Sequence, residues 1–130
     1  MVLLTHDAAM KTQNPKIISV VFYKTPAGKE PVREWMLKLG KDDRYIIGVD
    51  LKTVEFGWPL GMPLVCSMKN YDRLWEVRSS ISGNRIARVL FTVHDSRMAL
   101  LHGFIKKTQK APKSDLDLAG DRKREVNRGN

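Results

Sequence analysis

Four strand-like segments follow one another in the second half of the chain, and the connections between them are only long enough for hairpins. They cover residues 64–69, 74–80, 85–94 and 98–106, and they are rich in β-branched, aromatic and aliphatic residues. Short connections join antiparallel neighbours, because a crossover between parallel strands needs a much longer segment. This half of the chain is therefore predicted to form an antiparallel sheet.

The first half of the chain adds one strand and two helices. Residues 17–23 are β-branched and aromatic, as expected for a strand. Pro31 suits the first turn of one helix. Asp42 or Asp43 can cap a second helix, which ends at Gly57. Because several strands are apolar at successive positions, these helices are expected to cover one face of the sheet.

A last helix is predicted from residues 114–117, which read SDLD and have the S-x-x-D form of a capping box. Residues 1–15 are expected to be a mobile lead-in, and the polar tail 121–130 is expected to fray. The length of 130 residues suits one domain. The predicted fold is a single α+β domain over residues 1–130. In it, an N-terminal strand and two helices pack on a twisted, mainly antiparallel sheet, with a C-terminal helix.

Neither a metal, a cofactor nor a membrane is expected as a partner. Cys66 is the only cysteine, which excludes an intramolecular disulfide, and no residue spacing resembles a zinc site. No segment approaches the ~20 apolar residues of a membrane helix, and the N-terminus lacks the apolar run of a signal peptide. We therefore expect a cytoplasmic protein.

The positive charge of the chain is concentrated in one stretch. Of the net charge of +9, residues 69–110 supply +6, because they hold nine Lys and Arg against three Asp and Glu. Residues 1–68 supply +2 and residues 111–130 supply +1. A localised positive field favours a polyanion such as RNA or DNA. The residues of this stretch that we expect to bind RNA are Lys69, Arg73, Arg85 and Lys110.

Three charged residues lie inside the predicted strands. Alternation places Glu76 and Arg78 on one face of their strand, and Arg88 lies within an apolar run. A guanidinium there costs several kcal/mol to desolvate unless it is paired or faces a wet cleft. One interpretation is an internal ion pair of Glu76 with Arg78 or Arg88. The other is a row of cations that lines a solvated sheet and binds phosphate; in that case, removing Arg88 would relieve repulsion.

The last predicted strand ends in a run of lysines, since residues 100–112 read LLHGFIKKTQKAP. Lysines at this position can block edge pairing of the strand, but we interpret Lys106 and Lys107 as phosphate contacts. His102 shares its strand face with Lys106 and is a candidate for proton transfer near neutral pH. The alternative for His102 is a hydrogen-bonded core histidine.

The segment from residue 74 to residue 112, LWEVRSSISGNRIARVLFTVHDSRMALLHGFIKKTQKAP, resembles the RelE/ParE superfamily of bacterial toxins, specifically its phage-derived HigB-like branch. The resemblance is weaker over residues 17–57. It implies a toxin of a type II toxin–antitoxin system, a metal-independent endoribonuclease that cleaves mRNA on the ribosome and inhibits translation and growth. In such enzymes the RNA 2′-OH attacks the neighbouring phosphate. The residues that the resemblance implies as the catalytic site are Arg78, Arg88, Lys106 and Lys107, to which we add His102 as a candidate.

The resemblance also implies partners. These are a cognate helix-turn-helix antitoxin, the ribosome with its mRNA, and operator DNA that is contacted only through the antitoxin complex. Two alternatives are a ParE-like gyrase inhibitor and a non-catalytic RNA-binding regulator. The clustering of Arg78, Arg88 and the two lysines on the sheet favours RNA cleavage over gyrase inhibition.

Overall fold

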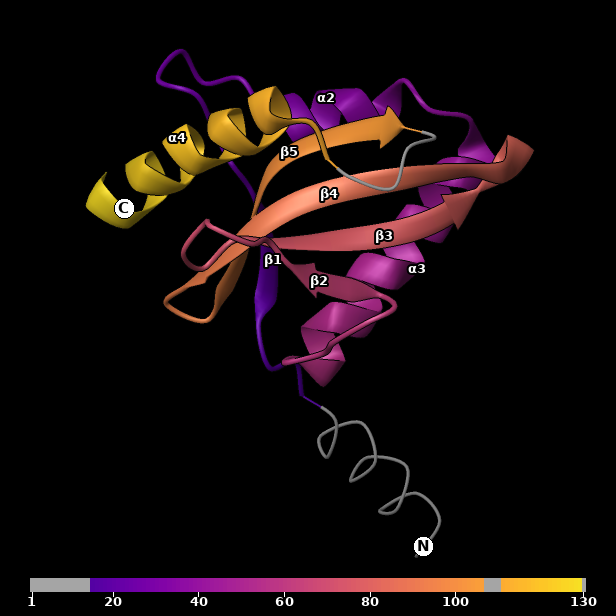
Figure 1. Cartoon of the computed structure of the whole chain (residues 1–130), viewed down its shortest axis with the longest axis horizontal. Coiled ribbons are helices and arrows are strands. Elements are labelled where there is room, and N and C mark those ends of the chain that lie inside the picture. The colour runs from indigo at the N-terminus through magenta and orange to yellow at the C-terminus, as the bar shows by residue number, and fades with distance from the viewer. Residues whose placement is uncertain (1–14, 107–110, 130) are drawn as a thin grey trace, which may run out of the picture.

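The computed structural model describes residues 15–106 and 111–129 (Figure 1). Its elements are β1 (Ser19–Phe22), α2 (Pro31–Leu37), α3 (Lys41–Gly57), β2 (Val65–Ser67), β3 (Trp75–Ile81), β4 (Arg85–His94), β5 (Arg97–Lys106) and α4 (Lys113–Gly129). The predicted α+β class and the predicted order of elements are confirmed, in an arrangement consistent with a RelE-like fold. None of the helices in these ranges has both the length and the apolar character that crossing a membrane requires.

The five strands form one mixed sheet in the order β1-β5-β4-β3-β2. Strands β2 to β5 pair with their chain neighbours in antiparallel fashion, as the short connections predict. β1 lies at the edge and is parallel to β5. Register along the sheet places Arg78 opposite Arg88, and Arg88 opposite Phe104. Charged and aromatic side chains from three strands are therefore neighbours on one face.

Helices cover both faces of the sheet. In Figure 1, α2 and α3 lie behind the sheet while α4 crosses its other face. The first layer is a large apolar core that includes Val32, Ile47 and Phe91. The layer beneath α4 is smaller and includes Leu90 and Ala119. The face under α4 thus has less apolar surface, and this is the face that carries Glu76, Arg78 and Arg88.

The close approach of α2 to β5 depends on a glycine. A Cβ built on Gly103 would lie only 2.5 Å from Cζ3 of Trp35, well inside van der Waals contact. The indole ring therefore packs directly against the backbone of β5. The glycine in the run LLHGF is explained by this contact, because any larger side chain would displace the ring.

The observed helix starts differ from the predicted caps. α3 begins at Lys41 after Gly40, and no side chain caps it. The carboxylate of Asp43 instead accepts hydrogen bonds from the backbone N–H (3.0 Å) and the hydroxyl (2.9 Å) of Ser82. The prediction that Asp42 or Asp43 caps this helix is wrong, because the Asp43 carboxylate is used in a contact with a distant turn.

The C-terminal residues form a helix where fraying was expected. α4 continues to Gly129 and is fastened to the sheet by polar contacts. Arg122 donates a hydrogen bond to a β5 carbonyl (2.8 Å), and Glu125 accepts one from the hydroxyl of Tyr23 (2.8 Å). The polar composition of residues 121–130 predicts fraying because hydropathy takes no account of such hydrogen bonds. Residues 1–14 of the predicted lead-in lie outside the described residues.

Candidate functional site

A buried carboxylate holds two arginines together within the sheet. Oε1 of Glu76 lies 2.7 Å from Nε of Arg78 and 2.8 Å from Nη1 of Arg88. Glu76 is fully buried and Arg88 is 1% exposed, whereas the Arg78 side chain is 25% exposed. The cluster forms because Arg78 and Arg88 are opposite each other in register and Glu76 lies two residues from Arg78 on the same face.

The cluster matches the internal ion-pair interpretation, with both arginines on one carboxylate. Desolvating these charges costs several kcal/mol, and two short charge-assisted hydrogen bonds offset that cost. A solvated cleft around Arg88 is therefore not what the structure shows, because this side chain is buried. One carboxylate against two guanidinium groups leaves a formal charge of +1. Solvent reaches that charge through Arg78.

Arg78 opens onto a groove beside the edge of β3. β2 pairs only with Trp75, Glu76 and Val77, so the second half of β3 extends beyond it. The backbone N–H of Arg78 donates to the carbonyl of Leu64 (2.9 Å), which holds the preceding loop along this edge. The groove has a volume of about 510 Å³ and is lined by Ile46, Asp50, Pro63, Leu64, Arg78, Ser80 and Ile86.

His102 is joined to the C-terminal helix. Its Nε2 lies 2.6 Å from Oδ1 of Asp115, and its ring stacks on Phe104 with centroids 5.5 Å apart. Both partners of the pair are partly exposed. Phe104 is opposite Arg88 in register, so the imidazole lies one row of the sheet away from the buried arginine. His102 is therefore hydrogen-bonded, as the core interpretation requires, but it lies near the surface and close to the arginine cluster.

Asp115 was missed as a site residue. In the sequence it lies inside the S-x-x-D segment, between the two residues that form the capping box, so this pattern assigns it no contact. The contact with His102 depends on how α4 docks on the sheet, and no spacing rule predicts that docking. The S-x-x-D pattern itself is offset, because α4 begins at Lys113 and Asp117 binds Tyr71 (2.6 Å) and Lys113 (2.7 Å).

The predicted phosphate-binding lysines fall at the border of the described structure. Lys106 is the last residue of β5 and is opposite Ile86 in register, in the row next to Arg88 and Phe104. Its backbone therefore lies at the same end of the sheet as the arginine cluster. Lys107 and Lys110 lie outside the described residues. The phosphate-binding role of these lysines stays a prediction.

Arg85, one of the predicted RNA-binding residues, is engaged at the turn between β3 and β4. Its Nη2 lies 2.9 Å from Oδ2 of Asp43, and its Nε donates to the carbonyl of Ser82 (2.9 Å). The backbone hydrogen bond from Ser82 is the main reason why the pKa of Asp43 is lowered; the Ser82 hydroxyl and Arg85 lower it further, and burial opposes them. The Arg85 side chain is still 37% exposed, so its charge adds to the field at this end of the sheet.

Arg73 and Lys69 lie away from the arginine cluster, near the start of β3. Arg73 donates to a backbone carbonyl of β4, and its guanidinium lies 5.8 Å from the Trp75 ring centroid. Lys69 lines a separate pocket together with Lys113 at the start of α4. The structure thus divides the predicted site residues. Arg78 and Arg88 share one carboxylate, and His102 lies one row away from Arg88 on the same face. Arg85 is at the same end of the sheet, and Arg73 and Lys69 are not part of the group.

The described residues of the site provide fixed positive charge and a titratable imidazole. Arg78 offers a guanidinium anchored by a buried carboxylate, and His102 offers proton transfer supported by Asp115. Within the described ranges, no group of three or more His, Cys, Asp or Glu residues is arranged to hold a metal ion. The Arg78 guanidinium is suited to binding an anion, and the His102 imidazole is suited to moving a proton.

Comparison with known protein families identifies a family that covers most of the chain. The family described as phage-derived protein Gp49-like (DUF891) matches residues 34–124, more than two thirds of the chain. The matched range includes the Glu76–Arg78–Arg88 cluster and the His102–Asp115 pair. A comparison with curated proteins finds no match. The chain therefore belongs to the phage-derived Gp49-like family, a family of RelE-like, toxin-like proteins.

Proposed function

We propose that this protein is the toxin of a type II toxin–antitoxin system, of the HigB-like branch, and that it cleaves mRNA on the ribosome. Family membership supports the toxin part of the proposal. The observation that carries the chemistry is the Arg78 guanidinium, held at the wall of a groove by buried Glu76. A cation fixed in this way is preorganised for a phosphate and needs little rearrangement when charge develops.

The groove suits a nucleotide. Arg78 is hydrogen-bonded to Glu76 through Nε, and among the described residues its two Nη amino groups remain available for a phosphate oxygen. Ile46, Pro63 and Leu64 provide apolar walls beside it, against which a base or a ribose can pack. The positive excess of residues 69–110 adds attraction for the backbone of an RNA strand.

In the proposed reaction the 2′-oxygen of a ribose attacks the adjacent phosphorus. The bond from phosphorus to the 2′-oxygen forms while the bond to the 5′-oxygen breaks, leaving a 2′,3′-cyclic phosphate and a 5′-hydroxyl. One proton leaves the 2′-OH and another reaches the departing 5′-oxygen. Arg78 stabilises the charge on the phosphate, with Lys106 and Lys107 as further proposed contacts. His102, oriented by Asp115, is proposed to transfer one of the protons.

Arg88 has a different proposed role from Arg78. It is buried and touches Glu76, so it acts on the reaction through that carboxylate and not by direct contact with RNA. Without Arg88, the Glu76 charge would be balanced by Arg78 alone, and the positive field at the groove would fall. We therefore assign Arg88 to positioning and electrostatic support of Arg78.

The test is cleavage of end-labelled mRNA by purified protein on programmed ribosomes. The expected products carry 2′,3′-cyclic phosphate and 5′-hydroxyl ends, and Arg78→Ala is expected to lower the rate by about 100-fold or more. Arg33→Ala, which removes an exposed arginine from α2, is the matched control and should cut normally. Intact mRNA in the presence of folded protein would contradict the proposal.

Two further assays separate the alternatives. Inhibition of gyrase-driven supercoiling without mRNA cleavage would favour the ParE-like alternative. Salt-dependent binding of RNA without cleavage would favour a non-catalytic regulator. The proposed antitoxin partner is tested by expression: the protein alone should arrest bacterial growth, and a helix-turn-helix protein encoded beside it should restore growth. Operator DNA should be bound only by the complex of the two proteins.

A further inference from the structure

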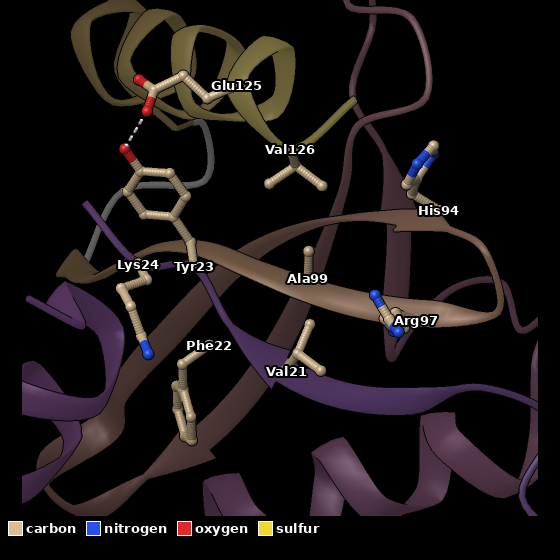
Figure 2. A pocket seen from close by; sticks show the side chains of 9 residues that line it. All are labelled: Val21, Phe22, Tyr23, Lys24, His94, Arg97, Ala99, Glu125 and Val126. Atoms are coloured by element: carbon tan, nitrogen blue, oxygen red, sulfur yellow. Dashed lines mark hydrogen bonds between the residues drawn. The ribbon is translucent and has the colours of Figure 1, made fainter. Parts of the chain in front are cut away.

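A small cavity lies near the hairpin between β4 and β5. This is the far end of β4 from Ile86 and the candidate site. It is enclosed by β1, β5 and the C-terminal half of α4 and has a volume of about 180 Å³. Figure 2 shows Val21, Ala99 and Val126 facing one another from these three elements, so the body of the cavity is apolar. None of the residues of the candidate site lines it.

One end of the cavity is closed by a hydrogen bond. The hydroxyl of Tyr23 donates to Oε1 of Glu125 at 2.8 Å, drawn as a dashed line in Figure 2. Burial, and then the Glu125 carboxylate, raise the pKa of Tyr23, so the phenol keeps its proton and remains a donor. Glu125 is the one acidic residue among the described residues that line the cavity, and its carboxylate already accepts the hydrogen bond from Tyr23.

The rest of the rim is cationic. Arg97 and Lys24 are exposed, and neither forms an ion pair with any residue in the described ranges. His94 lines the same rim, and its Nε2 lies 3.4 Å from a carboxylate oxygen of Asp95. Figure 2 shows Arg97 and His94 at the end away from the Tyr23–Glu125 bond. A ligand that enters at this end contacts apolar side chains inside the cavity. At the mouth it contacts the guanidinium of Arg97, which has no ion-pair partner among the described residues.

We propose that this cavity binds a small carboxylic acid whose apolar body is a single ring or a short branched chain. An apolar cavity of about 150 Å³ accepts a benzene ring, whereas sites for larger organic ligands start near 300 Å³. The observed volume therefore limits the apolar part of the ligand to about one ring. The carboxylate of such a ligand can pair with Arg97 in a two-pronged hydrogen bond. This binding site is independent of the RNA-cleaving site proposed above.

The test is a titration of the full-length protein with phenylacetate, followed by NMR of the backbone amides. We expect saturable shifts at Val21, Ala99 and Val126, with a Kd on the order of 1 mM or lower for a ligand of this size. Benzyl alcohol, which keeps the ring but lacks the charge, should bind about tenfold more weakly. Acetate, which keeps the charge but lacks the ring, should cause no saturable shift there.

Two variants test separately how the Arg97 charge and the apolar cavity contribute to ligand binding. Arg97→Gln should weaken phenylacetate binding about tenfold and leave benzyl alcohol unchanged, while Arg33→Gln on α2 should change neither. Val21→Phe places a larger side chain in the cavity and should abolish binding of both ligands. Because Val21 is partly exposed, the variant is expected to fold, and melting curves check this. Absence of saturable shifts, equal affinity for the acid and the alcohol, or full affinity in Arg97→Gln would each overturn the proposal.

Discussion

Asp115 of α4 lies 2.6 Å from Nε2 of His102 in β5, so the C-terminal helix supplies a carboxylate to the candidate site. A carboxylate in this position orients an imidazole for proton transfer. The two residues come from different elements and meet only because α4 docks across the sheet. If His102 transfers a proton in the proposed cleavage, Asp115 positions it for that step.

The first prediction concerns this pair. His102→Ala is expected to slow mRNA cleavage about 100-fold or more, as for loss of a general acid or base. Asp115→Asn keeps a hydrogen-bonding partner but loses the charge, and should slow cleavage roughly tenfold, the low end for a supporting partner. Asp115→Glu should restore part of the rate. The informative measurement is the pH–rate profile, which Asp115→Asn should alter. An unchanged profile would mean that the pair serves only to dock α4.

The second prediction concerns the buried cluster. Glu76→Gln leaves Arg88 buried without its carboxylate, which is expected to cost about 3–5 kcal/mol of the free energy of unfolding and to lower Tm by roughly 10 °C or more. Arg88→Ala should also lower Tm, because the carboxylate then keeps only Arg78; the solvated-cleft interpretation predicted no loss. Arg78→Ala is the matched variant, expected to lose cleavage with a smaller fall in Tm because this side chain is partly exposed. Equal Tm values for all four proteins would contradict the argument.

The third prediction concerns the contact of α2 with β5. Gly103→Ala places a methyl group against the Trp35 ring and is expected to destabilise the protein by about 1–3 kcal/mol through overpacking. Trp35→Leu removes the ring and makes room for the methyl group. In a double-mutant cycle measured by urea unfolding, Gly103→Ala should therefore cost less in the Trp35→Leu background than in the wild type. Additive effects would show that the ring does not restrict this position.

The fourth prediction concerns pH. The pKa of Asp43 is lowered in the folded protein, so its charged form favours folding, and its contribution is complete above the ordinary pKa of 3.8. As the pH falls through the lower folded value, Asp43 binds a proton and the contribution is lost. Asp43→Asn should therefore be less stable than wild type at pH 7, and the difference should shrink as the pH falls below 3.8. Urea unfolding at pH 7, 5 and 3 measures it.

Asp42→Asn is the control for this experiment, since Asp42 is exposed and adjacent in α3. It should change the free energy of unfolding by less than about 0.5 kcal/mol at pH 7. If Asp43→Asn keeps the same deficit in stability at every pH, the hydrogen bonds from Ser82 do not depend on the charge of Asp43.

Local patterns in the sequence determined the elements and most of the sheet. Alternation identifies the strands, and connections of a few residues leave no choice but antiparallel pairing for β2 to β5. The same alternation places Glu76, Arg78 and Arg88 correctly on one face. Alternation could not predict whether β1 runs parallel or antiparallel to β5, because two helices and three strands separate the two strands in the chain. Nor could it predict that the polar tail forms a helix, because its docking depends on partners such as Tyr23.

Only the tertiary structure decided which charges meet and which of them reach solvent. The sequence allowed Glu76 to pair with either arginine and allowed Arg88 to face a wet cleft; register and packing put both arginines on one carboxylate and buried Arg88. In the same way, the S-x-x-D segment gives no reason to expect a distant contact for Asp115, which lies between its two capping positions; the contact with His102 exists because of where α4 docks. Contacts of this kind join residues far apart in the chain. They depend on how whole elements are oriented, which no single segment of sequence specifies.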